Sequence, residues 1–131
     1  MFLGTFPAKF LGSWQMVLPA KLRSALGSDR AIITIGFDKC VYGFSVDDWQ
    51  KIADQEVLNK PLFSKEGGEI RRRLFAAALE VDLDDQGRFV IPETLRDYAE
   101  LKTNLVVIGA GDHFEIWDKD EWANLSHSSP S

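Results

Sequence analysis

The feature that most constrains the fold of this chain is an internal repeat with a spacing of 73 residues. Three pairs of identical residues mark it: Pro19 and Pro92, Arg23 and Arg96, and Trp49 and Trp122. Ile35–Gly36 and Ile108–Gly109 fall at the same spacing between those pairs, so the alignment needs no gap. A register this constant indicates a duplicated structural unit.

The sequence pattern predicts the same order of short elements in both units. An apolar strand ends at a proline, which stands at the first position of a short helix. A β-branched strand, a turn, a second strand and a closing helix with Asp near its start follow. The first unit has helix 19–26, strands 31–35 and 40–44, and helix 45–52; the second has helix 92–99, strands 105–108 and 113–117, and helix 118–125. A helix over about 69–78 joins the units, and the tail 126–131 is predicted to be disordered.

Strands of about four to six residues are too short to form a stable sheet within one unit. Two units folded against each other could close a small barrel and leave fewer open edges. The sequence therefore predicts an α+β fold in which the duplicated units form a pseudo-dimeric barrel. Trp49 and Trp122, at equivalent places in the closing helices, are expected to pack in its core.

Charge is distributed unevenly along the chain. The net charge is −5, which argues weakly against a nucleic-acid binder, yet no acidic residue precedes Asp29, whereas Lys9, Lys21 and Arg23 do. The opening segment is therefore compatible with a local phosphate-binding face. The single cysteine, Cys40, forms no internal disulfide, which favours a reducing cytosol. No apolar run approaches the roughly 18 residues that span a membrane.

Residues with metal-binding or catalytic chemistry lack the spacing that those functions need. His113, His127 and Cys40 do not form a metal-ligand pattern, and the chain has no nucleophile motif. The segment Gly109–Asp112 is too short for a phosphate-cradling loop and is followed by a strand. We therefore expect a protein that is not an enzyme and has no cofactor, no metal and no small-molecule substrate.

The turn Asp84–Arg88 (DDQGR) is the most distinctive local motif of the second unit. Gly87 can adopt the positive φ of a tight turn, and Asp84 can accept hydrogen bonds from the amides of the turn. Arg88 then either pairs with Asp84 and stabilises the turn, or contacts phosphate or a base edge.

The first unit has Leu11–Gln15 (LGSWQ) in the same place and lacks both charges. Trp14 stands at the position of Gly87. An apolar ring on a turn is usually docked on a neighbouring surface, so a subunit contact is favoured over a wedge between DNA bases.

Several stretches together resemble the MraZ family. They are "MFLGT" at the start, "GFDKCVYGF" followed by "DDW", "RRLFAAA", "DDQGRFVIPETLR" and "VVIGAGDHFEIWDKDEW", in the family's order over nearly the whole chain. The resemblance implies a bacterial, cytoplasmic, nucleoid-associated transcription factor that binds repeated sites upstream of the division and cell-wall gene cluster. It also implies two SpoVT-AbrB-type units, at residues 5–47 and 76–119, forming a swapped-hairpin (double-split) β-barrel with short helices.

The family carries a D-x-x-x-R motif in each unit, and both motifs are implicated in DNA contact. Here the second motif is intact at Asp84 and Arg88, whereas the first falls on Leu11 and Gln15, with Trp14 at the family's glycine. Gln15 can contact adenine or phosphate but adds no charge. The expected DNA-binding residues are Asp84, Arg88, Arg23, Lys21, Lys9 and Gln15.

Two functions stay open at this point. One is a sequence-specific regulator that binds double-stranded DNA at repeated promoter sites as a homo-oligomeric ring, with no membrane partner. The other is a ring-forming protein-interaction module that has lost direct DNA binding, with Trp14 serving a protein contact. Loss of charge at the first motif weakens the binding of each subunit modestly, but a ring multiplies that loss.

Overall fold

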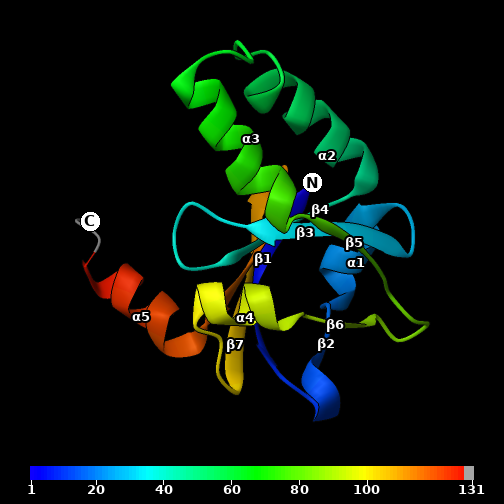
Figure 1. Cartoon of the computed structure of the whole chain (residues 1–131). Helices are drawn as coiled ribbons and strands as arrows, with labels where there is room; N and C mark the ends of the chain where they lie inside the picture. The colour runs from blue at the N-terminus through cyan, green and yellow to red at the C-terminus, as the bar shows by residue number, and fades with distance from the viewer. Residues whose placement is uncertain (129–131) are drawn as a thin grey trace.

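The computed structural model describes residues 1–128 and shows an α+β protein (Figure 1). Its strands are β1 Phe2–Lys9, β2 Gln15–Val17, β3 Arg30–Ile35, β4 Val41–Phe44, β5 Leu79–Asp82, β6 Arg88–Val90, β7 Asn104–Gly111 and β8 Phe114–Asp118. Its helices are α1 Ala20–Leu26, α2 Val46–Ile52, α3 Lys65–Ala77, α4 Glu93–Ala99 and α5 Lys119–Ser128, with a 3-10 turn η1 Gly12–Trp14 and a π-helical turn η2 Ala53–Val57. Because α5 reaches Ser128, the predicted disorder of the tail is wrong for residues 126–128, and residues 129–131 lie outside the described residues.

Local sequence sets where several helices begin and end. Pro19 and Pro92 stand immediately before α1 and α4, at the N-cap and not at the predicted first helical position. Ser45 and Ser64 cap α2 and α3, because each side-chain oxygen accepts a hydrogen bond at 3.0 Å from a backbone N–H in the first turn. Gly27 ends α1 with a φ of 71°, a conformation that glycine adopts at no steric cost.

Strand pairing interleaves the two units. The order of the large sheet is β1-β7-β8-β4-β3-β5, and β2 and β6 form a separate pair. All pairs are antiparallel; β3–β4 and β7–β8 lie within one unit, whereas β1–β7, β4–β8, β3–β5 and β2–β6 each join the two units. Each unit therefore completes its sheet only with strands of the other, as in a dimer fused into one chain.

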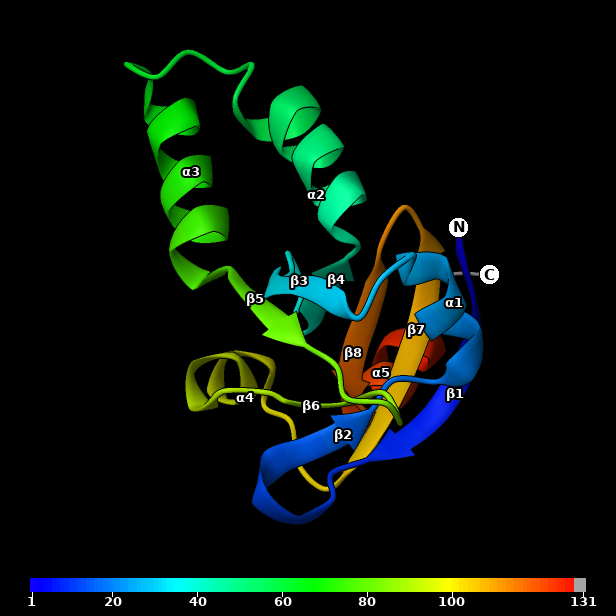
Figure 2. The same cartoon turned by 90° about the vertical axis from the view of Figure 1, so that its right-hand side faces the viewer.

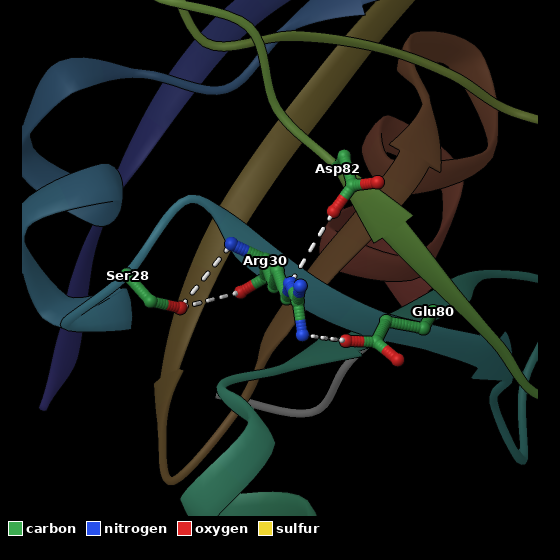
Figure 3. Close-up of polar contacts among 4 residues, drawn as sticks. All are labelled: Ser28, Arg30, Glu80 and Asp82. Atoms are coloured by element: carbon green, nitrogen blue, oxygen red, sulfur yellow. Dashed lines mark hydrogen bonds and ion pairs between the residues drawn. The ribbon is translucent and has the colours of Figure 1, made fainter.

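The closed barrel that the sequence predicted is not seen. β1 and β5 are the two ends of the six-stranded sheet, and no ladder joins them within residues 1–128. After each of these strands the chain turns into β2 or β6, which pair with each other instead (Figure 2). At the β5 edge, the Arg30 guanidinium pairs with Glu80 at 3.4 Å and with Asp82 at 3.5 Å (Figure 3). Charged side chains at an open edge discourage pairing with a strand of another chain.

A pseudo-twofold axis relates the two units. Met16 lies opposite its repeat equivalent Phe89 in the β2–β6 pair, and Tyr42 lies opposite its equivalent Glu115 in the β4–β8 pair. Since a residue faces its own counterpart only across a twofold axis, both pairs lie on that axis. The predicted duplication is thus present as internal symmetry of the strand pairing.

The alignment without gaps is wrong for the central strand of each unit. The Gly36 N–H donates to the Cys40 carbonyl, and the equivalent bond of the second unit runs from the Ala110 N–H to the His113 carbonyl. Cys40 and His113 are 73 residues apart, but Gly36 and Ala110 are 74 apart. The connection before β7 is therefore one residue longer than that before β3, and the turn after β7 is one residue shorter. The two changes cancel, so the alignment hides them.

Both units build the hydrophobic core. Its large, fully buried side chains include Phe2, Met16, Leu22, Ile33, Leu95 and Phe114. Trp49 and Trp122, expected in this core, are only half-buried and lie at its border. The Trp49 ring packs with its centroid 5.2 Å from that of Phe44, and the Trp122 ring 5.5 Å from that of Trp117.

The helices α2 and α3 form a hairpin that extends away from the sheet (Figures 1 and 2). Its base is tied to the sheet by the Thr34 hydroxyl, which donates to the Leu74 carbonyl at 2.7 Å. Its open end is closed by Arg71, which donates to the Gly67 carbonyl at 3.1 Å and to the Lys60 carbonyl at 3.0 Å. The hairpin is thus held by hydrogen bonds both at its base and at its far end.

Candidate nucleic-acid interface

The turn between β5 and β6 is organised by the Asp84 carboxylate. Its Oδ1 accepts hydrogen bonds from the backbone N–H groups of Gln86 and Arg88, both at 2.9 Å, and its Oδ2 accepts one from Arg88 Nε at 2.6 Å. The bond from the Arg88 backbone N–H, followed by that from its side chain, lowers the pKa of Asp84. The interpretation of this motif as a turn with a local ion pair is confirmed, and DNA contact by Arg88 stays a prediction.

Arg88 lies on the outward face of the β2–β6 pair. Met16 and Phe89 are buried and face the core. Because successive side chains of a strand point to opposite faces, the residues next to them face outward. The outward face therefore carries Gln15, Val17, Arg88 and Val90. The Arg88 side chain is 41% exposed, and its Nη atoms have no hydrogen-bond partner within the part of the chain that the structure describes.

Arg23 of α1 packs across this turn from the other unit. A Cβ at Gly87 would lie 2.5 Å from Arg23 Cδ, so the close approach depends on the missing side chain. Gly87 also has a φ of 81°, which disfavours any other residue. Arg23 Nε is buried without a hydrogen-bond partner among residues 1–128.

The equivalent turn of the first unit keeps the closing hydrogen bond without the charges, although Ser13 adopts a positive φ that its equivalent Gln86 does not. The Leu11 N–H donates to the Gln15 carbonyl at 2.7 Å, as the Asp84 N–H does to the Arg88 carbonyl at 3.0 Å. Trp14 has a φ of 60°, in the left-handed region that Gly87 also adopts. The turn thus forms in the first unit without the charged pair of the second.

The Trp14 side chain is seated on its own subunit and is still 49% exposed. The Arg96 guanidinium lies 4.3 Å from the centroid of the Trp14 ring, and the Phe10 ring meets it edge-on at 5.3 Å. Arg96 also donates to the Ile91 carbonyl at 2.7 Å. The functional assignment from sequence missed Arg96, although its repeat equivalence to Arg23 pointed to it.

Of the six predicted DNA-binding residues, the structure brings Arg23, Asp84 and Arg88 together and places Gln15 on the same strand pair. Lys9 lies at the far end of β1, opposite Asn104, and Lys21 is exposed in the first turn of α1. No hydrogen bond or ion pair joins either lysine to the Asp84–Arg88 turn in the described chain.

Other chemistry is sparse in the described part of the chain. Residues 1–128 hold no group of three or more His, Cys, Asp and Glu side chains placed to bind a metal ion. No helix among them is both long and apolar enough to cross a membrane. Cys40 is buried, and burial raises the pKa of its thiol, which keeps it in the unreactive protonated form.

Comparison with protein families gives a match over nearly the whole chain. The family model described as "MraZ protein, putative antitoxin-like" matches residues 1–71 and 74–130. The first segment contains β1 to η2 and the start of α3, and the second contains β5 to α5, so each covers one unit of the duplication. Since the match extends over far more than half of the residues, the chain belongs to the MraZ family.

Proposed function

We propose that this chain is a sequence-specific DNA-binding transcriptional regulator that contacts double-stranded DNA through the outward face of β2–β6. The observation that carries the proposal is the geometry of Arg88, whose Nε is held by Asp84 at 2.6 Å on an outward-facing position. A guanidinium held in this way presents a planar fork suited to guanine O6 and N7 or to a phosphate. Membership of the MraZ family supports the same assignment.

The two ends of this face have different roles in the proposal. At the second-unit end, Arg23 packs across Gly87 beside Arg88, so two cations lie close together. At the first-unit end, Gln15 stands where the other end has Arg88. We assign the charge-dependent contacts to the second-unit end and weaker, uncharged hydrogen bonding to Gln15.

Assembly into a homo-oligomeric ring is part of the proposal, because one intact motif per subunit supplies only modest affinity. A ring in the nucleoid that engages repeated sites upstream of the division and cell-wall gene cluster raises the effective concentration of each face for its site. The protein carries a net charge of −5, so attraction to DNA must come from the local cations and is screened strongly by salt.

The interleaved pairing supports the fold assignment that accompanies this function. β1 and β5 each pair with the central strand of the opposite unit, and β2 pairs with β6. We assign these strands to SpoVT-AbrB-type swapped hairpins within residues 5–47 and 76–119.

A salt titration of DNA binding tests the proposed function. The intact protein is titrated into a labelled duplex from upstream of the division and cell-wall gene cluster, and into a scrambled duplex of equal length. We expect the cognate duplex to bind more tightly, with an affinity that falls steeply between about 50 and 200 mM salt. Equal binding of the two duplexes at low salt contradicts the proposal.

The same titration with Arg88→Ala tests the residue that carries it. We expect a loss of about 1–3 kcal/mol in binding free energy and a salt slope lower by about one. The backbone N–H at position 88 still bonds Asp84, so circular dichroism should stay unchanged. Gln15→Ala, at the equivalent position, is the matched control and should leave the salt slope as it is. Wild-type affinity in Arg88→Ala rules out the role assigned to this residue.

The exposed Trp14 ring favours one alternative, a ring-forming interaction module without direct DNA binding. In the single chain, Trp14 is 49% exposed. If a neighbouring subunit covers this exposed part in the assembly, Trp14→Gly should change the subunit stoichiometry measured by native mass spectrometry. The glycine suits the positive φ of this position, so the fold should persist. An unchanged assembly counts against a subunit contact at Trp14.

A further inference from the structure

A cavity of about 280 Å³ is lined by side chains of the α2–α3 hairpin, of β3 and β4, and of the turn between β7 and β8, and by none of β2 or β6. Tyr42 and Phe44 of β4 form its floor, and side chains of α2, η2 and α3 form its walls. Asp112 and His113, from the turn between β7 and β8, also line it. The cavity is thus built where the hairpin of the first unit meets a turn of the second.

Aromatic rings line the floor as a continuous set. The Phe44 ring lies 5.2 Å from the Trp49 ring and stacks on the His113 imidazole at 5.6 Å, and the Tyr42 ring lies 4.5 Å from that imidazole. Gly36 makes room for Tyr42, because a Cβ there would lie 2.7 Å from Tyr42 Cε1. The faces of such rings carry partial negative charge.

The wall formed by η2 is locally unusual. Residues Ala53–Val57 form a π-helical turn, and Ala53, Glu56 and Val57 line the cavity. Turns of this kind are rare and occur frequently at functional sites.

The charged and hydroxyl side chains around the cavity differ in whether they have a hydrogen-bond or ion-pair partner. Four of them have partners: Thr34 with the Leu74 carbonyl, Lys60 with Glu66, Asp112 with His113, and His113 also with Glu115. Glu56 has no partner among the described residues. One exposed carboxylate without a partner therefore lies beside a set of aromatic faces, and the cavity is also lined by Lys60, whose ammonium pairs with Glu66 at 3.8 Å.

We propose that this cavity binds a small organic cation with an apolar body, such as an arylalkylammonium ion, with the body against Phe44 and Trp49 and the charge at Glu56. Aromatic faces attract a cation, most strongly where water is partly excluded, and the exposed Glu56 carboxylate adds a weaker, solvent-screened attraction. A cavity of about 280 Å³ accommodates a single-ring molecule. This binding goes beyond the proposed DNA contact and does not depend on it.

Two probes of nearly equal shape test the charge preference. Phenethylammonium and neutral 2-phenylethanol are titrated into the full chain, and binding is followed by the NMR resonance of the Trp49 indole. We expect the cation to bind about fivefold more tightly than the alcohol. Glu56→Gln should remove this preference. Asp54→Asn, on the same turn but with its carboxylate bonded to Gln50 at 3.1 Å, is the matched control and should retain it.

The possible outcomes test two claims separately: that the cavity is the binding site, and that its ligand is a cation. Equal binding of the two probes by the wild-type chain, or a preference that persists in Glu56→Gln, overturns the assignment of a cationic ligand. Absence of binding by either probe up to about 10 mM, a concentration that already detects very weak complexes, overturns the site itself. Ala53→Leu should fill the cavity and abolish binding of both probes; if a folded Ala53→Leu still binds them, the cavity is not the site. If that variant does not fold, the comparison of Glu56→Gln with Asp54→Asn decides.

Discussion

At the scale of the residue, one position of the repeat is filled in two opposite ways. Gly87 and Trp14 both have a positive φ, of 81° and 60°. In the second unit the missing side chain lets Arg23 cross the turn in close contact. In the first unit the Trp14 ring fills that space and Arg96 lies 4.3 Å above it. The equivalent turns are therefore stabilised by close packing in one copy and by a cation–π contact in the other.

Replacing Gly87 by alanine should destabilise the protein by about 1–3 kcal/mol, because a left-handed conformation is unfavourable for alanine and the new Cβ meets Arg23. Urea unfolding measures the change. Gly12→Ala is the control, since no atom lies within 4 Å of a Cβ at that position and its φ is not positive, and it should change stability by less than about 1 kcal/mol. Equal effects of the two substitutions contradict this account of Gly87.

At the scale of the element, the turn between β7 and β8 is held by a small side-chain network. His113 bonds Asp112 through Nδ1 at 2.7 Å and Glu115 through Nε2 at 2.8 Å, and Trp117 donates to Glu115 at 2.9 Å. Burial is the largest influence on the pKa of His113 and opposes protonation, but the bonds to Glu115 and Asp112 outweigh it and raise that pKa. Burial likewise acts to raise the pKa of Glu115, and the bonds from His113 and Trp117 lower it overall.

These shifts predict a pH-dependent contribution from His113. Because its folded-state pKa is raised, its stabilisation is complete below the ordinary value of about 6.5 and is lost as the pH rises through the folded-state pKa. Glu115, with a lowered pKa, stabilises above its ordinary value of about 4.3 and loses that effect as the pH falls. The stability lost in His113→Gln should therefore be greatest near about pH 5–6 and smallest above about pH 8. Urea unfolding at three pH values measures it, and a constant difference contradicts the network.

At the scale of the whole molecule, the interleaved strands make two units one cooperative structure. Four of the six strand pairs join the units, and Met16 and Phe89 meet on the pseudo-twofold axis. Neither half retains a complete sheet without the other. The two units should therefore unfold together and not in succession.

Phe89→Ala tests this cooperativity. The Phe89 side chain is 4% exposed, so its loss should cost about 3–5 kcal/mol. Urea transitions followed by far-UV circular dichroism and by tryptophan fluorescence should coincide in the wild type and in the variant. Val90→Ala is the control, because Val90 is the next residue but is 46% exposed and should lose far less. Two separate transitions contradict a single cooperative unit.

The sequence by itself determined the duplication, the α+β class, the helices after Pro19 and Pro92, and the turn at Asp84–Arg88. These features follow from the identity of neighbouring residues: proline before a helix, β-branched runs in strands, and a carboxylate that can bond the amides of its own turn. Local chemistry of this kind can be interpreted without knowing what lies elsewhere in the chain.

Only the tertiary structure decided which strands pair, in which register, and which side chains meet. The one-residue shift of β7 is hidden because a longer connection and a shorter turn cancel. The approach of Arg23 to Gly87 and the stacking of Arg96 on Trp14 depend on how one unit is laid across the other. The physical reason is that these are contacts between residues far apart in the chain, and their geometry is set by packing across the pseudo-twofold axis, which no local pattern encodes.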